Sequence, residues 1–403
     1  MKRRSLPLLA LLLLFNTAAS ALEPVLVVTP RAQVLPVSAT NRPFLAAGQA
    51  LQRVDLPARG YVESELRVSG RAKVYDWAPA GDAVTPRADA PYVTRILVRQ
   101  PKDAARFSGR VIVELLDAAA GYDSAPLWGL SWDYFMKHGD AWVGVTVQPA
   151  AAAALRRFDG VRYAAMSLGV AQPESCNASG AGSPLAWDAL AQVGALLRSS
   201  SKENPLLALN PQRFIAAGYG QSGGYVITFA NALHAWQRLG DGAPIFDGYL
   251  SAVATHAAPV NPCAPALAAD DAHAGVQLRD VPFVMVLGES AAQAATPLRD
   301  DSDAPGDVFR LYKAAGLENS GAFAAGQPAA ADLKIAGLPV PAVEPCREPR
   351  TGFPATLALN AIWQQYDDLL QHQLPMNKEP RDVPNDARSR QTCGAGIANA
   401  HPH

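Results

Sequence analysis

The stretch from Phe214 to Tyr225, which reads F-I-A-A-G-Y-G-Q-S-G-G-Y, constrains the fold of this chain more than any other. Its segment Gly220-Gln221-Ser222-Gly223-Gly224 matches the pattern G-x-S-x-G. In a nucleophile elbow a strand turns sharply into a helix, and a serine with small neighbours sits at the strained apex. Phe214 to Ala217 is apolar like a buried strand, and Tyr225 to Leu239 has helical spacing of apolar residues. We predict an elbow with Ser222 at its apex; an ordinary strand-to-helix turn is the alternative.

The first residues have the pattern of a secretory signal peptide. Lys2, Arg3 and Arg4 precede an apolar run from Leu6 to Phe15, and Ala19-Ser20-Ala21 fits an A-x-A cleavage site. No later segment reaches the roughly 18 consecutive apolar residues that a membrane span requires. We therefore expect residues 1–21 to be removed and the chain from about Leu22 to be secreted or periplasmic.

Charge points to no macromolecular partner. The 403 residues include 35 Lys and Arg against 36 Asp and Glu, a formal net charge of −1. This balance argues against a nucleic acid or an anionic membrane surface as partner.

The length of the chain allows one large α/β domain or two ordinary ones. We expect a single domain over residues 22–403, with loop insertions near 150–183 and 257–280.

Four cysteines are spread along the chain without C-x-x-C spacing, which argues against zinc and a thioredoxin-like site. They are Cys176, Cys263, Cys346 and Cys393. In an exported protein we expect disulfides, and the sequence does not choose among the three possible pairings.

Strand and helix patterns alternate along the chain, as in α/β folds. Strands are expected at Val25–Thr29, Tyr61–Tyr75, Tyr92–Val98, Val111–Leu116, Ala141–Val147, Phe246–Thr255, Val281–Leu287 and Val308–Tyr312, and helices at Trp128–Lys137, Leu185–Arg198 and Ala355–Leu370. The run Val111–Leu116 is almost entirely apolar, as expected for a strand covered by helices on both faces. The stretch from Ala150 to Ser183 reads as irregular and is long enough to cover a site.

Five segments together resemble the α/β-hydrolase superfamily, and within it a group of exported bacterial alpha/beta hydrolase domain proteins. They are Y-V-T-R-I-L-V-R-Q-P (Tyr92 to Pro101), G-R-V-I-V-E-L-L-D (Gly109 to Asp117), V-G-V-T-V-Q (Val143 to Gln148), R-F-D-G-V-R-Y (Arg157 to Tyr163) and A-A-G-Y-G-Q-S-G-G. The resemblance implies an eight-stranded, mostly parallel sheet with helices on both faces. It also implies a serine hydrolase that acts on small-molecule esters through an acyl-enzyme, without a cofactor.

The resemblance further implies an acid after the seventh strand and a histidine after the eighth. Glu289 is retained as the acid, but Ala291 stands where related proteins carry an aspartate, and Asn319 stands where they carry the histidine. An amide has no titratable nitrogen that could take the serine proton.

A third departure lies in the expected oxyanion hole. The hole would be formed by the backbone N–H groups of Gly223 and Ala118. Asp117 replaces the asparagine of related proteins at the start of this loop. A carboxylate that pointed into the hole would oppose a developing oxyanion, whereas one facing away would be harmless. We count three further positions as part of the expected site: Asp117, Asn319 and Gln221, which precedes Ser222 in the motif.

Another histidine would have to replace the missing base. His256 directly follows the strand Phe246–Thr255, and ligands of α/β sheets gather at the carboxyl ends of strands. It is the provisional base, with a loop histidine as the alternative. His273 reaches the site only if its loop folds over. Packing, capping or terminal positions are expected for His138, His234, His372, His401 and His403.

Two functions follow. The first is an exported serine hydrolase, carboxylesterase-like, with Ser222 as nucleophile, Glu289 as acid and His256 as base. The second is a catalytically impaired binding protein of the same fold, motivated by Asn319 and Ala291. A structural protein without a site is a third, weaker interpretation, since the elbow glycines have no other evident use.

The acidic run from Arg299 to Asp303 lies among Ala, Pro and Gly and is read as a solvated loop, so no metal is expected.

Overall fold

The computed structural model describes residues 25–38, 41–78, 84–170, 182–254, 256–263, 267–268, 271–277, 280–288, 298–314, 317, 320–341 and 355–372. Within them, one sheet contains ten strands in the order β11-β12-β10-β9-β7-β5-β6-β4-β3-β2. Its strands are β2 (Arg31–Val34), β3 (Tyr61–Trp77), β4 (Val84–Pro101), β5 (Arg110–Leu115), β6 (Ala141–Val145), β7 (Arg213–Tyr219), β9 (Gly248–Ala252), β10 (Phe283–Leu287), β11 (Ser302–Ala304) and β12 (Asp307–Lys313). A separate parallel pair joins β1 (Val25–Leu26) to β8 (Gln237–Arg238).

The centre of the sheet is parallel. Neighbouring strands from β12 through β10, β9, β7 and β5 to β6 all pair in parallel. The pairs β4–β6, β3–β4, β2–β3 and β11–β12 are antiparallel. This arrangement confirms the expected α/β class. The described sheet has ten strands rather than the eight implied by the resemblance, because the short strands β2 and β11 extend its two edges.

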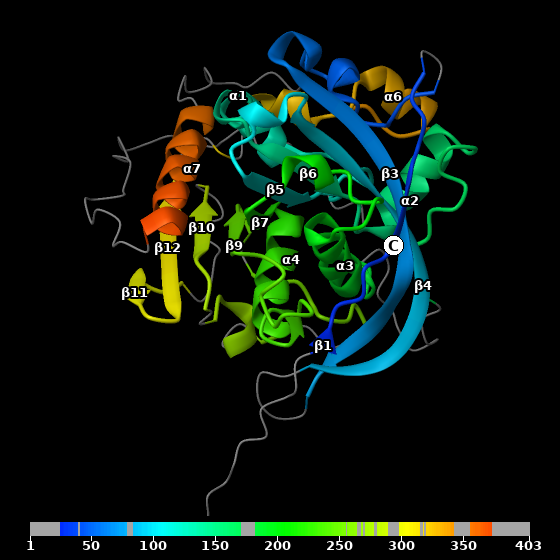
Figure 1. Ribbon diagram of the computed structural model, residues 1–403. Helices are drawn as coiled ribbons and strands as arrows, with labels where there is room; N and C mark the ends of the chain where they lie inside the picture. The colour runs from blue at the N-terminus through cyan, green and yellow to red at the C-terminus, as the bar shows by residue number, and fades with distance from the viewer. Residues whose placement is uncertain are drawn as a thin grey trace, which may run out of the picture.

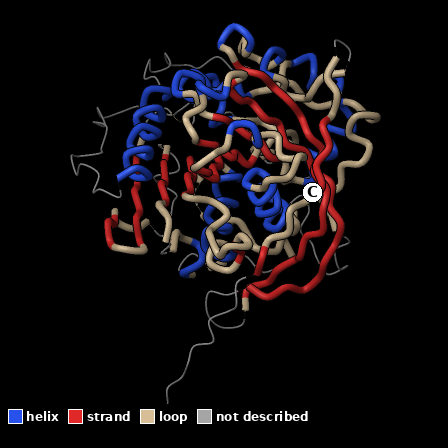
Figure 2. Tube along the Cα trace, viewed as in Figure 1, coloured by secondary structure: helices blue, strands red, loops and turns tan. Residues whose placement is uncertain are grey.

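Helices flank the sheet (Figure 2). The α-helices are α1 (Pro126–His138), α2 (Pro149–Phe158), α3 (Ala186–Arg198), α4 (Gln221–Thr228), α6 (Ala330–Ile335) and α7 (Ala355–His372). A π-helical turn, η5 (Phe229–Leu233), continues α4. Short 3₁₀ turns are η1 (Ala47–Gln49), η2 (Pro57–Arg59), η3 (Ala104–Arg106), η4 (Leu207–Leu209), η6 (Ala272–Ala274) and η7 (Ser320–Gly326). Every residue of β5, β6 and β9 is buried, as expected for strands covered on both faces.

The strands β3 and β4 form a long curved hairpin around one side of the molecule (Figure 1). Helix α3 is attached to this hairpin because the Asp188 carboxylate accepts from the Lys73 N–H at 2.8 Å and from the Tyr75 hydroxyl at 2.7 Å. Helix α4 lies beside α3, and the rings of Tyr225 and Trp187 stack at 4.8 Å. The hairpin and α3 thus hold the helix that follows β7.

The expectation of an irregular stretch from Ala150 to Ser183 is wrong in its first part. Helix α2 begins at Pro149. Proline is tolerated in the first turn of a helix, because the N–H that it lacks would have no partner within the helix there. Five alanines follow this proline and favour the helix. Residues 171–181 of the expected insertion lie outside the described residues, and the single-domain boundary stays a prediction.

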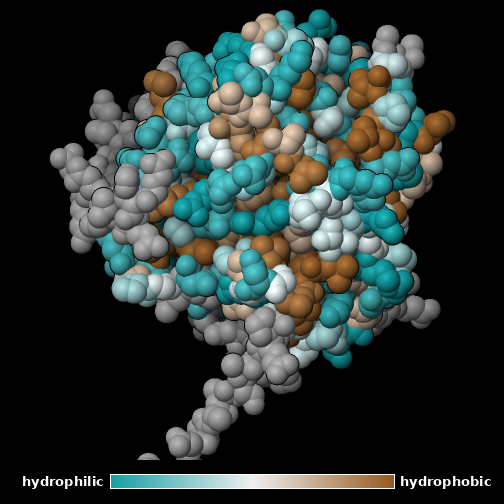
Figure 3. Space-filling model, in the orientation of Figure 1, coloured by the Kyte–Doolittle hydropathy of each residue, from teal (hydrophilic) through white to brown (hydrophobic). Residues whose placement is uncertain are grey.

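The viewed face of the molecule mixes hydrophilic and hydrophobic residues (Figure 3). In the described part of the chain, no helix has the length and hydropathy that a membrane crossing requires.

Candidate functional site

The strand-to-helix turn after β7 places Gly220, not Ser222, at its apex. Strand β7 ends at Tyr219, and α4 begins at Gln221. Gly220 joins them with φ 55° and ψ −121°, a positive φ that is strained for residues with a side chain. In a nucleophile elbow this strained apex presents the catalytic side chain. The prediction that Ser222 occupies the apex is therefore wrong, because β7 reaches the turn two residues earlier.

A second glycine pattern in the same stretch places the elbow apex at Gly220. Gly218-Tyr219-Gly220-Gln221-Ser222 has the spacing of G-x-S-x-G with glycine at the central position and a small serine at the end. Gly218 is the first small neighbour, since a Cβ there would lie 2.3 Å from the Ser222 carbonyl oxygen. The two patterns overlap, and only the end of the strand decides between them.

The Ser222 side chain lies inside the first turn of α4. The residue is fully buried, and its Oγ donates a hydrogen bond to the Leu116 carbonyl oxygen at 2.9 Å. Among the described residues, no histidine forms a hydrogen bond with this hydroxyl. As it lies, Ser222 links the start of α4 to the end of β5.

The glycines that follow Ser222 have a packing role. A Cβ at Gly223 would lie 2.9 Å from the Ala254 Cβ, and one at Gly224 would lie 2.8 Å from the His256 carbonyl oxygen. Both distances are too short for any Cβ contact, so these glycines let α4 approach the segment after β9. The expectation that the glycines have no use besides catalysis is wrong.

The Asp117 carboxylate lies at the N-terminus of α4. Its Oδ1 accepts from the Ala119 N–H at 3.1 Å, whereas its Oδ2 is buried without a hydrogen-bond partner among the described residues. A Cβ added at Gly220 would lie 3.5 Å from this Oδ2, an ordinary contact distance. The carboxylate thus faces the elbow apex.

Burial raises the pKa of Asp117 to about 6. The backbone N–H groups of Ala119, Ser222 and Gln221 act in the opposite direction and favour the charged form, and the charge of Asp123 raises the pKa further. The N–H groups of Gln221 and Ser222 do not complete a hydrogen bond to Oδ2. Desolvation therefore outweighs the positive end of the helix.

The predicted oxyanion donors are not arranged as expected. In an elbow the donor is the N–H of the residue after the apex. With Gly220 at the apex that residue is Gln221, whose N–H acts on the Asp117 carboxylate, and not Gly223. Ala118 lies in a tight turn whose carbonyl accepts from the Gly121 N–H at 2.8 Å. Negative charge occupies the surroundings in which an oxyanion would have to develop.

Of the other predicted catalytic residues, the structure describes only His256, and it does not bring this histidine to the Ser222 hydroxyl. His256 is exposed and follows β9, as expected, but it forms no hydrogen bond with the Ser222 hydroxyl. Glu289, Ala291 and Asn319 lie outside the described residues. The chain before Asn319 passes close to the elbow, because the Leu317 carbonyl accepts from the Tyr219 hydroxyl at 2.8 Å.

Three further described histidines, His138, His234 and His273, have local contacts. His234 is buried, with Nδ1 at 2.8 Å from the Tyr249 hydroxyl and Nε2 at 2.5 Å from Asp280 Oδ1. It lies 12 residues beyond Ser222, roughly 18 Å along the helical segment at ~1.5 Å per residue. His273 contacts Asp271 and lies against the Trp77 ring at 4.0 Å, and His138 stacks on Tyr134 at 3.9 Å. These contacts are of the packing and capping kind.

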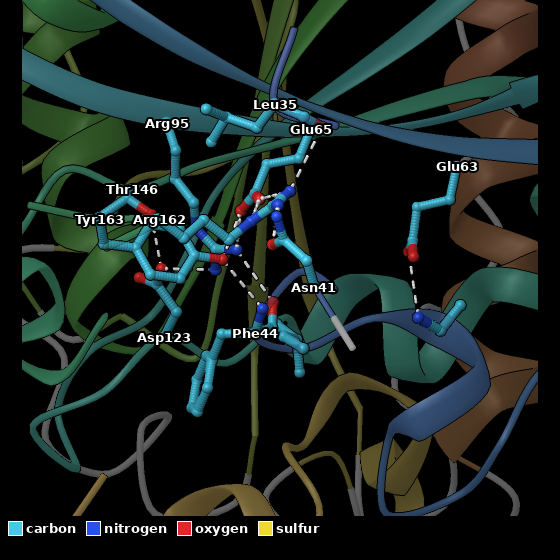
Figure 4. A network of polar contacts seen from close by, with 12 residues as sticks. Leu35, Asn41, Phe44, Glu63, Glu65, Arg95, Asp123, Thr146, Arg162 and Tyr163 are labelled. Atoms are coloured by element: carbon cyan, nitrogen blue, oxygen red, sulfur yellow. Dashed lines mark hydrogen bonds and ion pairs between the residues drawn. The ribbon is translucent and has the colours of Figure 1, made fainter. Parts of the chain in front are cut away.

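A buried ion network supports the loop that carries Asp117 (Figure 4). Arg95, fully buried on β4, donates to Glu65 Oε1 at 2.6 Å and to Asp123 Oδ2 at 2.9 Å. Thr146, just after β6, donates to the same Asp123 oxygen at 2.5 Å. Asp123 lies six residues after Asp117, so the network fixes the end of this loop.

Two of the five segments that carry the family resemblance supply the arginine and tyrosine side chains of this region. From R-F-D-G-V-R-Y, Arg162 donates to Glu65 Oε2 at 2.6 Å and Tyr163 donates to Glu65 Oε1 at 2.8 Å. From Y-V-T-R-I-L-V-R-Q-P come Arg95 and Arg99, and the Arg99 Nε donates to Glu63 at 2.8 Å. In these two segments, the polar residues link the hairpin to the chain around the elbow loop.

Sequence reasoning missed three polar residues near the elbow. Asp123 Oδ1 and Gln148 Nε2 are buried without a hydrogen-bond partner among the described residues. Tyr225, one turn after Ser222, is buried; burial raises the pKa of its hydroxyl to about 12, while Gln148 beside it acts to lower the pKa. Whether a polar side chain is buried and lacks a hydrogen-bond partner depends on the tertiary structure, so nothing in the sequence indicated these residues.

The described residues include one of the four cysteines and part of the acidic side chains. In the described ranges, no group of three or more His, Cys, Asp and Glu side chains is placed to hold a metal ion. Of the four cysteines, Cys263 belongs to the described residues, and the others lie outside them.

Comparison with known proteins places the chain in a family. The family model described as "Alpha/beta hydrolase domain" matches residues 27–392. No curated protein matches this chain. Solved structures with similarity include a carboxylesterase, Cest-2923, from Lactobacillus plantarum WCFS1, with 14% identity, a TM-score of 0.38, and coverage of 72% of this chain and 96% of that one. An alpha-beta serine hydrolase homologue from Coxiella burnetii has 11% identity, a TM-score of 0.30, and coverage of 60% and 86%.

A structure from an analysis of two fungal esterases from Rhizomucor miehei has 11% identity, a TM-score of 0.34, and coverage of 74% of this chain and 85% of that one. At such values no activity is transferred from these proteins. The family model, in contrast, spans most of the chain. This chain therefore belongs to the alpha/beta hydrolase domain family.

Proposed function

We propose that this member of the alpha/beta hydrolase domain family is exported and binds a small molecule at the carboxyl edge of its sheet, without acyl transfer through Ser222. The observation that carries the proposal is Gly220 at the elbow apex, where a hydrolase needs a side chain that attacks the substrate. Export rests on the signal-peptide pattern of residues 1–21. It would bring the four cysteines into an oxidising compartment, where disulfides form.

Acyl transfer through Ser222 meets two further obstacles. A serine hydroxyl needs an adjacent base to act as a nucleophile, and here it donates to the Leu116 carbonyl oxygen. The Asp117 carboxylate lies near the N–H of Gln221, which follows the apex. A tetrahedral intermediate would develop its negative charge against this carboxylate, the opposite of the stabilisation that an oxyanion hole supplies.

Labelling with a fluorophosphonate, followed by peptide mass spectrometry, tests the proposal. We expect no modification of Ser222 and no hydrolysis of short p-nitrophenyl esters above the rate of Ser222→Ala. Ser251→Ala is the matched control, since Ser251 is a second buried serine whose hydroxyl donates to the Gly223 carbonyl. Labelling of Ser222, together with turnover that only Ser222→Ala abolishes, would reject the proposal.

The second candidate is a serine hydrolase with Ser222 as nucleophile, Glu289 as acid and His256 as base, acting on a small ester without a cofactor. Family membership and the position of Ser222 in the first turn after β7 favour it. It requires Ser222 Oγ to leave the Leu116 carbonyl and His256 to approach. A pH profile of any esterase activity, lost in His256→Gln and retained in His138→Gln, would support this candidate.

A further inference from the structure

Three buried polar atoms near the elbow lack a hydrogen-bond partner among the described residues. They are Asp117 Oδ2, Asp123 Oδ1 and Gln148 Nε2. Asp123 and Gln148 are 0% and 3% exposed, respectively. A buried polar atom without a partner costs about 1–3 kcal/mol, so three of them in one region call for an explanation.

We call Asp117, Asp123 and Gln148 the polar cradle, because all three follow the ends of the neighbouring strands β5 and β6. Asp117 and Asp123 belong to the loop after β5, and the charge of Asp123 raises the pKa of Asp117. Asp123 contacts Thr146 after β6, and Gln148 is two residues further along the same segment. The cradle therefore lies at the carboxyl ends of two neighbouring parallel strands, where α/β sheets bind ligands.

The two carboxylates of the cradle differ in charge compensation. Asp123 is paired with the Arg95 guanidinium at 2.9 Å. Asp117 has no lysine or arginine partner among the described residues. Only backbone N–H groups favour its charged form. A buried charge is normally paired with an opposite charge or bound to a cation. The opposite charge at Asp117 is missing from the described residues.

We infer that the cradle binds a small organic ammonium ion, whose N–H groups donate to Asp117 Oδ2 and Asp123 Oδ1 while Gln148 Nε2 donates to an oxygen of the same ligand. The inference rests on the proposed binding function and names its ligand class. Gly220 leaves the space beside Asp117 Oδ2 free of a side chain. A carboxylate ligand is excluded, because it would meet Asp117 with like charge.

Titration of the full mature chain with three matched probes, followed by NMR, tests this inference. The probes are 2-aminoethanol, ethylene glycol and glycolate, which share a hydroxyl and differ at the other end in an ammonium, a hydroxyl or a carboxylate. We expect saturable binding of 2-aminoethanol, at least about 10-fold tighter than of ethylene glycol, and no binding of glycolate.

The variant Asp117→Asn should weaken binding of 2-aminoethanol by about 10–100-fold, since a hydrogen bond to a charged group is lost. Asp89→Asn is the control, because Asp89 is exposed and pairs with Arg71 on the hairpin. Circular dichroism of both variants checks that they fold.

Equal binding of glycolate, unchanged binding in Asp117→Asn, or no binding of any probe would overturn the inference. Calcium chloride that displaces 2-aminoethanol at equal concentration would do so as well, because the cradle would then be a metal site. Fluorophosphonate labelling does not depend on these titrations, so failure of the ligand class and failure of the proposed function are distinguishable.

Discussion

Glu65 is a fully buried carboxylate, whereas Asp117 is half-buried with its Oδ2 shielded from solvent, and their surroundings differ. Glu65 accepts hydrogen bonds from Arg95, Arg162 and Tyr163 at 2.6–2.8 Å, and all of these groups come from within the fold (Figure 4). Asp117 accepts one from the Ala119 N–H at 3.1 Å and leaves Oδ2 without a partner among the described residues.

The difference separates a structural from a functional use of the same group. A carboxylate whose partners are complete stabilises the fold and has no capacity left for a ligand. A carboxylate with one buried oxygen unused destabilises the fold and is a candidate for binding a ligand. The network around Glu65 therefore holds the elbow loop, and Asp117 is the residue of that loop to which we assign the ligand.

The largest expected effect tests the structural side of this comparison. Glu65→Gln should lower the free energy of unfolding by about 3–5 kcal/mol, because it removes one partner of a buried ion network and leaves Arg95 and Arg162 short of negative charge. Urea unfolding at neutral pH measures it. Asp89→Asn, at an exposed ion pair, should change it by less than about 1 kcal/mol. Equal effects of the two changes would contradict the structural role of Glu65.

The same chemical change at the other carboxylate should have the opposite sign. Asp117→Asn should raise the free energy of unfolding by about 1–3 kcal/mol at pH 8, because it removes a buried charge without a cationic partner. Urea unfolding of wild type and variant at that pH measures it. A loss of stability as large as in Glu65→Gln would show that the two carboxylates have the same role.

The gain in Asp117→Asn should depend on pH. Folding raises the pKa of Asp117 to about 6, above its value in the unfolded chain, so the folded protein binds more protons. Its stabilising contribution is complete below about pH 4 and is lost as the pH rises through about 6. The difference between variant and wild type should thus vanish near pH 4 and be constant above about pH 7. A difference independent of pH would contradict a buried, titrating Asp117, whatever the ionisation of its neighbours Asp123 and Tyr122.

Local patterns predicted the elements because they report burial and turns directly. The expected strand Tyr61–Tyr75 is β3 (Tyr61–Trp77), and the expected helix Trp128–Lys137 lies within α1 (Pro126–His138). Helix α2 was missed because five consecutive alanines fill its first half, so that its polar face becomes visible only at Arg156 and Arg157 in its last turn. Periodicity detects a helix by the difference in polarity between its two faces. A run of identical small residues shows no such difference.

The position of the elbow apex was predicted wrongly for a different reason. Gly220 and Ser222 fit two overlapping patterns, and the choice depends on where β7 leaves the sheet. That point is fixed by the neighbours β5 and β9, since Tyr219 pairs with Ala252 and the Gly220 N–H donates to the Ala252 carbonyl at 2.8 Å. Contacts between strands distant in sequence decided it.

The sequence alone determined the α/β class, the family resemblance and the presence of a strand-to-helix turn rich in glycine, because these depend on residue types at short spacing. Only the tertiary structure decided that Gly220 forms the apex, that Ser222 donates to Leu116, and that the Asp117 carboxylate faces the start of α4. Register, burial and the direction of a side chain depend on what the rest of the fold places around it. The turn identifies the family of this chain, and the neighbours of the turn define what its site can bind.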